Sequence, residues 1–191
     1  KDHHITTQKT IIKNRLWTDT AYHIRDSDIG VIISDSRLFP TLKKKTIALK
    51  WLGHYPTDEI TAMLHVASAK NGTEFQDSLK DFGLPAQNMI FADIKGNIGN
   101  VLATSLTNRP AAFPKSLWST PTAVTQDYQK IYNATTLPAQ INPASGFVVS
   151  ANNIPVKGDN IPLVSWYTTS DDRIKRLNHL LSQNRRYSVA D

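Results

Sequence analysis

A polar turn between two apolar runs is the strongest local pattern in this chain. The turn is Asp93-Ile94-Lys95-Gly96, and the runs cover residues 89–92 and 98–103. An aspartate at the start of a turn accepts hydrogen bonds from backbone amides, and glycine adopts the left-handed conformation that other residues resist. The pattern predicts a β-hairpin, which on its own indicates structure rather than function.

Helical periodicity precedes and follows this hairpin. Residues 57–69 and 73–82 predict two short helices, and Thr57 is the expected N-cap of the first. Ile60, Met63, Leu64 and Ala67 fall on one face of that helix. A last helix is predicted to begin near residue 170. Its apolar stripe consists of Ile174, Leu177, Leu180 and Leu181.

The leading portion of the chain is β-rich. Residues 5–16, 20–25, 30–35 and 46–52 predict strands, because they are rich in apolar or β-branched residues and are separated by polar ones. Together with the helices they predict an α+β fold class with mixed helix and sheet. We expect a β-rich leading segment at residues 1–40 and an α+β portion at residues 41–191.

Composition excludes several classes of protein. The chain of 191 residues has no cysteine, which rules out disulfides, thiolate nucleophiles and zinc sites built on thiolates. No apolar run approaches the roughly 20 residues that span a bilayer, so no membrane partner is expected. The net charge of +6 is scattered, and no basic stripe is interleaved with aromatic residues. Nucleic acid is therefore not a predicted partner, and a basic module that binds an anionic polymer stays a less favoured alternative.

Common catalytic and metal-binding motifs are missing from the sequence. It has no Gly-x-Ser-x-Gly elbow, no phosphate-binding glycine loop and no His-Glu-x-x-His helix. Its six histidines lack metal-ligand spacing apart from the adjacent His3 and His4, which we interpret as a solvated strand end. The residues alone predict no cofactor and no metal.

Six short motifs follow one another in a fixed order. They are Ala-Leu-Lys-Trp-x-Gly at residues 48–53, Pro-Ala-Gln-Asn at 85–88, Phe-Ala-Asp-x-x-Gly-Asn-Ile-Gly at 91–99, Asn-Pro-Ala-Ser-Gly-Phe at 142–147, Ser-Ala-Asn-Asn at 150–153 and Asp-Arg-Ile at 172–174. From roughly residue 28 to residue 181, this order resembles the penicillin acylase (penicillin amidase) family of N-terminal-nucleophile hydrolases. The resemblance implies a sheet-rich part of the αββα fold of these hydrolases.

The resemblance also implies an activity. Family members release an acyl group from an amine by means of a serine at the start of the larger subunit. The α-amino group of this serine, which titrates at about pH 8, acts as base. No residue here matches that serine, and the chain begins at Lys1 without an initiator methionine. We therefore expect an internal section of the larger subunit that is inactive by itself. The alternative is a non-catalytic scaffold or subunit-assembly module of the same fold.

The resemblance singles out two candidate site residues. Asn152 matches the asparagine whose amide donates to the negative oxygen of the tetrahedral intermediate, a role that suits a neutral donor. Asn153 takes this role if the alignment shifts by one residue, and an ordinary turn is the structural alternative. Arg173 matches an arginine that orients the asparagine and disfavours protonation of a nearby amine. Its alternative is a surface arginine paired with a neighbouring aspartate.

Substrate and partners are less constrained. The family usually has an aromatic residue after Gly99, where this chain has Asn100. The choice among β-lactam side chains, cephalosporins and acyl-homoserine lactones as substrates stays open. The resemblance implies a periplasmic or secreted location and partners in the smaller subunit and the rest of the larger one, and we expect isolated chains to self-associate. Some family members bind calcium, for which no ligand is assigned here.

Overall fold

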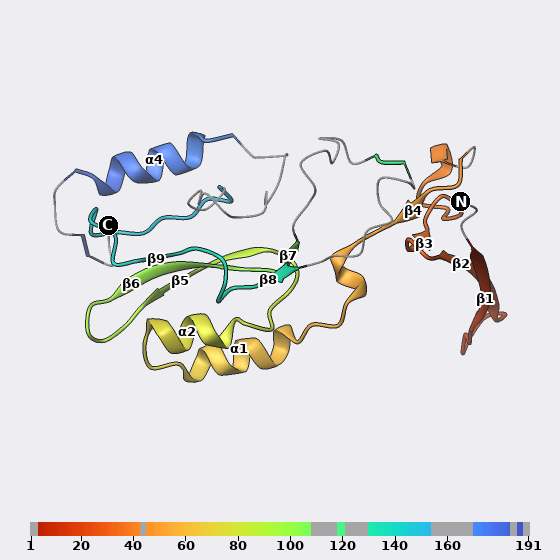
Figure 1. Cartoon of the computed structure of the whole chain (residues 1–191), viewed down its shortest axis with the longest axis horizontal. Helices are drawn as coiled ribbons and strands as arrows, with labels where there is room; N and C mark the ends of the chain where they lie inside the picture. The colour runs from red at the N-terminus through yellow and green to blue at the C-terminus, as the bar shows by residue number, and fades with distance from the viewer. Residues whose placement is uncertain are drawn as a thin grey trace. The chain divides into compact units, whose positions relative to one another are not determined.

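The structure, a computed structural model, describes residues 4–42, 45–107, 118–120, 130–153, 170–183 and 187–188. Contacts divide the chain into two compact units. The first unit contains residues 1–54 and 116–127, and the second contains residues 55–115 and 128–191. Helices and antiparallel sheets both occur, which confirms the predicted α+β class (Figure 1).

The first unit contains a four-stranded antiparallel sheet with the order β1-β2-β3-β4. Its strands are β1 (Ile5–Ile12), β2 (Thr20–Ser27), β3 (Val31–Ile32) and β4 (Ala48–Leu49). β1 and β2 pair along their full length, from Ile5 opposite Ser27 to Ile12 opposite Thr20. The leading strands are thus confirmed, although β3 and β4 are shorter than the runs that predicted them. The 3-10 helices η1 and η2 cover Pro40–Leu42 and Leu52–His54.

The second unit is built around a three-stranded antiparallel sheet with the order β5-β6-β9. Its strands are β5 (Gln87–Ala92), β6 (Ile98–Ala103) and β9 (Ala139–Ile141), and β7 (Leu106–Thr107) pairs separately with β8 (Ile131–Tyr132). Figure 1 shows α1 (Glu59–Ser68) and α2 (Gly72–Ser78) along one side of this sheet and α4 (Asp172–Leu181) on the other. The buried core consists of Ala62, Leu79, Phe82, Phe91, Val101, Ala103 and Ala134.

The predicted hairpin is β5-β6, and its turn has the expected chemistry. Oδ1 of Asp93 accepts hydrogen bonds from the amides of Lys95 and Asn97, both at 2.9 Å, and Oδ2 accepts from Nδ2 of Asn97 at 2.8 Å. These bonds, led by the one from the Asn97 side chain, hold the pKa of the Asp93 carboxyl below its ordinary value. Gly96 has a φ of 83°, the left-handed conformation for which glycine was expected.

Two hydrogen bonds of the Asn142 side chain link the end of β9 to this hairpin. Its Oδ1 accepts from the amide of Ile98 at 3.0 Å, and its Nδ2 donates to Oδ1 of Asn97 at 2.8 Å. The first residue of the Asn-Pro-Ala-Ser-Gly-Phe motif therefore has a structural function, which is to set where the chain leaves the sheet toward the loop that carries Asn152.

The apolar face of α1 noted in the sequence is not the face that packs in the core. Ile60 is 78% exposed, and Met63 and Leu64 are also exposed, whereas Ala62 is 2% exposed and packs in the core with Val66. The helix carries apolar residues on two faces. The small side chain of Ala62 lets α1 pack closely against its neighbours in the core. The face with the larger side chains of Ile60, Met63 and Leu64 is exposed.

The N-cap of α1 also differs from the prediction. Oδ1 of Asp58 accepts from the amide of Thr61 at 2.9 Å, so Asp58 rather than Thr57 is the N-cap. The Thr57 hydroxyl instead donates to Oε1 of Glu59 at 2.5 Å. Both residues can cap a helix, and here the Thr57 hydroxyl is engaged with Glu59 while Asp58 provides the cap.

The Glu59 carboxylate joins the start of α1 to the segment after α2. Besides the Thr57 hydroxyl, its Oε1 accepts from the amides of Gly83 and Leu84, each at 3.1 Å. These bonds, led by the one from Thr57, lower the pKa of Glu59 from an ordinary 4.5 to about 2. A carboxyl whose pKa is lower in the folded state contributes stability above its unfolded pKa and loses that contribution as the pH falls toward the folded value.

We expect Glu59→Gln to lower the free energy of unfolding at pH 7 by about 1–2 kcal/mol, because bonds to a charged acceptor are strong but solvent screens a partly exposed carboxylate. The difference from the unchanged chain should shrink as the pH falls from about 5 to 2. Urea unfolding followed by circular dichroism at several pH values measures it. Asp77→Asn, which removes a charge from an exposed position of α2, is the control. Parallel pH curves for Glu59→Gln and the unchanged chain would contradict this role.

Candidate active site

The candidate site is built on the short loop at residues 151–153. Ala151 is buried, and its amide donates to Oδ1 of Asn153 at 3.0 Å. Between them Asn152 has a φ of 59°, a left-handed conformation that few non-glycine residues adopt and that asparagine tolerates better than most. On β5, Nδ2 of Asn88 donates to the carbonyl oxygen of Asn153 at 3.1 Å. The sheet thus helps to hold Asn152 in an unusual conformation, a feature that clusters at functional sites.

Arg173 comes from a different element, the first turn of α4, and contacts Asn152 directly. Its Nη1 donates a hydrogen bond to Oδ1 of Asn152 at 3.0 Å, and both side chains are exposed. A guanidinium has donors only, so the Asn152 carboxamide presents its oxygen to Arg173 and carries its nitrogen on the other arm. The structure therefore brings the two predicted residues together and turns the amide nitrogen of Asn152 away from the arginine.

The aspartates next to Arg173 have other partners. Oδ2 of Asp171 lies 3.8 Å from Nζ of Lys175, and Oδ2 of Asp172 accepts from the hydroxyl of Ser170 at 2.8 Å. In the part of the chain that the structure describes, neither aspartate forms an ion pair with Arg173. The arrangement differs from the surface arginine paired with a neighbouring aspartate that was the alternative for this residue.

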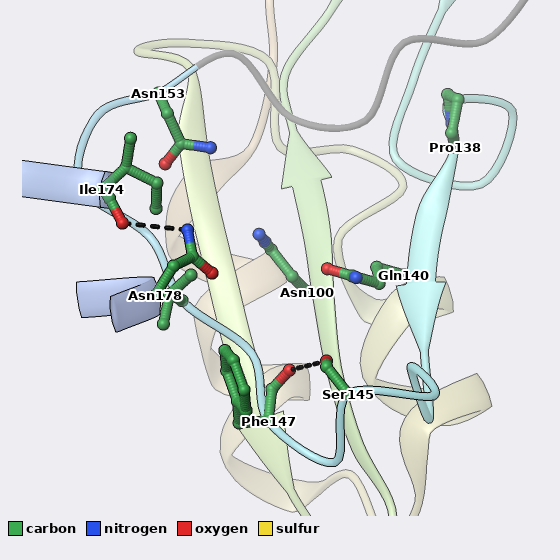
Figure 2. A pocket seen from close by; sticks show the side chains of 9 residues that line it. Asn100, Pro138, Gln140, Ser145, Phe147, Asn153, Ile174 and Asn178 are labelled. Carbon is green, nitrogen blue, oxygen red and sulfur yellow. Dashed lines mark hydrogen bonds between the residues drawn. The ribbon is translucent and has the colours of Figure 1, made fainter. Parts of the chain in front are cut away.

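A polar cavity of about 190 Å³ lies beside the loop. It is lined by Asn100, Pro138, Gln140, Ser145, Phe147, Val149, Asn153, Ile174 and Asn178. Figure 2 shows the carboxamides of Asn100 and Gln140 near each other on the sheet, with Asn178 and Ile174 coming from α4. None of the lining side chains is charged. Asn152 and Arg173 do not line the cavity, although their sequence neighbours Asn153 and Ile174 do.

Asn100 gives this cavity a buried polar wall. The residue is 8% exposed, and its Oδ1 has no hydrogen-bond partner among the described residues. It stands on β6 at the position after Gly99, where the resemblance predicts an aromatic side chain. The carboxamide is smaller than an aromatic ring and adds a hydrogen-bonding group, so this wall of the cavity differs in shape and polarity from the family pattern.

The described residues contain neither a metal-binding cluster nor a membrane span. Among them there is no group of three or more histidine, aspartate or glutamate side chains that could hold an ion. No helix in the described part of the chain is long and apolar enough to cross a bilayer. We therefore assign no calcium ligand to these residues.

Comparison with known proteins identifies the family of this chain. The family model for penicillin amidase matches residues 1–191, and the chain therefore belongs to the penicillin amidase family. No curated protein sequence matches the chain.

One similar solved structure is the thermostable penicillin G acylase from Alcaligenes faecalis in an orthorhombic form. It is 25% identical to this chain and superposes on it with a TM-score of 0.71. The match covers 97% of this chain and 33% of the acylase chain, so this chain spans about a third of the length of that chain.

Asn88 has a role that the sequence did not predict. The residue closes the Pro-Ala-Gln-Asn motif, which contributes to the family resemblance but predicts no role for Asn88. Its partner Asn153 is 65 positions away in the sequence, so no local pattern joins them. The available signal was a carboxamide directly before the apolar residues of a predicted strand.

Proposed function

We propose that this chain is part of an amide hydrolase of the penicillin acylase type, which cleaves a non-peptide amide between an acyl group and an amine. Membership of the penicillin amidase family supports the enzyme class. The observation that carries the site is the 3.0 Å hydrogen bond from Arg173 to Oδ1 of Asn152, because it leaves the carboxamide oriented as a donor.

In this proposal a serine outside the chain attacks the amide carbonyl, and its α-amine takes up the hydroxyl proton. Negative charge develops on the carbonyl oxygen, and the amide nitrogen of Asn152 donates a hydrogen bond to it. Arg173 is a positioning residue that holds the Asn152 oxygen, so the donor needs no reorganisation when the charge appears. The amine then leaves with the proton, and water releases the acyl group from the serine.

The remaining parts of the enzyme belong to the same proposal. The match to about a third of the penicillin G acylase chain supports partners in a smaller subunit and in the rest of a larger subunit. The family resemblance supports a periplasmic or secreted location. The exposure of Asn152 and Arg173 is compatible with a substrate site that other segments complete.

The isolated chain of 191 residues is expected to give no turnover of a chromogenic phenylacetyl or fatty-acyl amide, because it has no residue that matches the serine nucleophile. The complete, processed enzyme is expected to hydrolyse at least one of the two. Turnover by the isolated chain that Asn152→Ala abolishes would contradict the placement of the nucleophile. A complete, processed enzyme that is inactive on both amides would favour the non-catalytic scaffold instead.

A further inference from the structure

We propose that Asn88 is a positioning residue for Asn152, an inference that rests on the proposed function of Asn152. Asn88 lies on β5 opposite Leu102 of β6, so its backbone is part of the central sheet. From there its Nδ2 donates to the carbonyl oxygen of Asn153 at 3.1 Å. This bond connects the sheet to the loop at the residue that follows Asn152.

The loop is constrained on both sides of Asn152. Before it, Ala151 is buried, and its amide donates to Oδ1 of Asn153. After it, Asn88 anchors the carbonyl group of Asn153. A change in the backbone of Asn152 would therefore strain these contacts. Loss of the Asn88 bond removes the link between the sheet and the Asn153 carbonyl, so the loop that carries Asn152 should open more often.

The carboxamide oxygen of Asn88 indicates that this residue does more than stabilise the sheet. Its Oδ1 is buried and has no hydrogen-bond partner in the described part of the chain. A buried acceptor without a donor lowers stability, so an apolar side chain would serve the sheet better at this position. What the carboxamide adds is its donor to the loop.

Two bonds act on Asn152 from different directions. Arg173 orients its side chain through Oδ1, whereas Asn88 constrains the backbone that carries this side chain. A donor for a transient negative oxygen must already be in place when the charge develops, and displacement by about 1 Å is enough to cost about 100-fold in rate. The structure assigns the backbone part of this preorganisation to Asn88.

The first test needs no activity and uses the chain of 191 residues. Asn88→Ala is expected to speed hydrogen exchange of the Ala151 amide by about tenfold or more, because the loop opens more often, while amides of β6 such as that of Val101 keep their rates. Asn14→Ala is the matched control, since Nδ2 of Asn14 donates to the carbonyl of Thr18 at the same 3.1 Å but lies in the first unit. Unchanged exchange at Ala151, in a variant whose β6 amides show that it is folded, would overturn the inference.

The second test is a double-mutant cycle in the complete enzyme. Asn88→Ala is expected to lower kcat by about 10- to 100-fold with little change in KM, because only the geometry of the transition-state donor is disturbed. When Asn88→Ala is added to Asn152→Gly, kcat should fall no further, because the carboxamide that Asn88 positions is already absent. A multiplicative loss in the double variant would show that Asn88 acts elsewhere.

The two tests separate this inference from the proposed function. If Asn152→Gly leaves kcat unchanged, the oxyanion role of Asn152 fails, whereas the exchange experiment still decides whether Asn88 holds the loop. Asn88→Asp is a second variant of nearly the same size. At neutral pH its carboxylate cannot donate to the Asn153 carbonyl, so it should match or exceed the effect of Asn88→Ala in both tests.

Discussion

In the complete enzyme, Asn152→Gly is expected to lower kcat by about 10²- to 10³-fold, with a much smaller change in KM. Glycine adopts the φ of 59° found at this position without strain, so the substitution deletes the carboxamide and spares the loop. The loss should fall on kcat because, in the proposed role, the amide nitrogen would meet a negatively charged oxygen only in the transition state. Hydrolysis of a chromogenic amide at varied substrate concentration measures both constants.

Asn152→Asp distinguishes the donor from the rest of the side chain. A carboxylate still accepts the hydrogen bond from Arg173 that Oδ1 of Asn152 accepts at 3.0 Å, but it has no amide nitrogen. Its negative charge would also face the developing oxyanion, so the loss should be at least as large as for glycine. Asn14→Asp makes the same chemical change in the first unit and serves as control. If the donor is instead Asn153, the large loss will appear in Asn153→Asp and not at Asn152.

Phe91→Ala is expected to lower the free energy of unfolding by about 3–5 kcal/mol. The buried ring packs against Gly72 and Gly99 so closely that a Cβ at either glycine would lie 2.4 Å from a ring atom. It also packs against Phe75, with ring centroids 5.0 Å apart. The surrounding backbone is held by the sheet and α2 and cannot close over the space that the ring leaves, so most of the cavity penalty should remain.

Ile90→Ala is the control for the loss at Phe91. Ile90 is the neighbouring residue on β5 and is 46% exposed, so its truncation should cost less than about 1 kcal/mol. Urea unfolding followed by circular dichroism compares the two variants. Equal losses for Phe91→Ala and Ile90→Ala would show that the ring does not organise the core of the second unit.

The hairpin could be predicted from the sequence because its determinants are local. Asp93 and Gly96 lie three positions apart, and each has one strong conformational preference that the structure repeats. The buried face of α1 could not be predicted in the same way. The helix has two apolar faces, and only tertiary packing around Ala62 decides which of them is covered.

The candidate site depended on information of a different kind. Neither composition nor periodicity selects Asn152 or Arg173, which lie 21 positions apart, and only the order of motifs suggested them. The contact between their side chains emerges when α4 packs near the loop. Asn88 lay outside the prediction because its bond to Asn153 spans 65 positions and is made by a residue that looks like an ordinary strand position.

The amide nitrogen of Asn152 is proposed to point to the place where negative oxygen develops. A crystal structure of the complete enzyme, with its serine captured as a tetrahedral sulfonyl or phosphonate adduct, tests this most directly. We expect Nδ2 of Asn152 about 2.7–3.1 Å from an adduct oxygen, with Oδ1 still bound by Arg173. An adduct oxygen that receives its hydrogen bonds from other groups, with Asn152 directed elsewhere, would contradict the account.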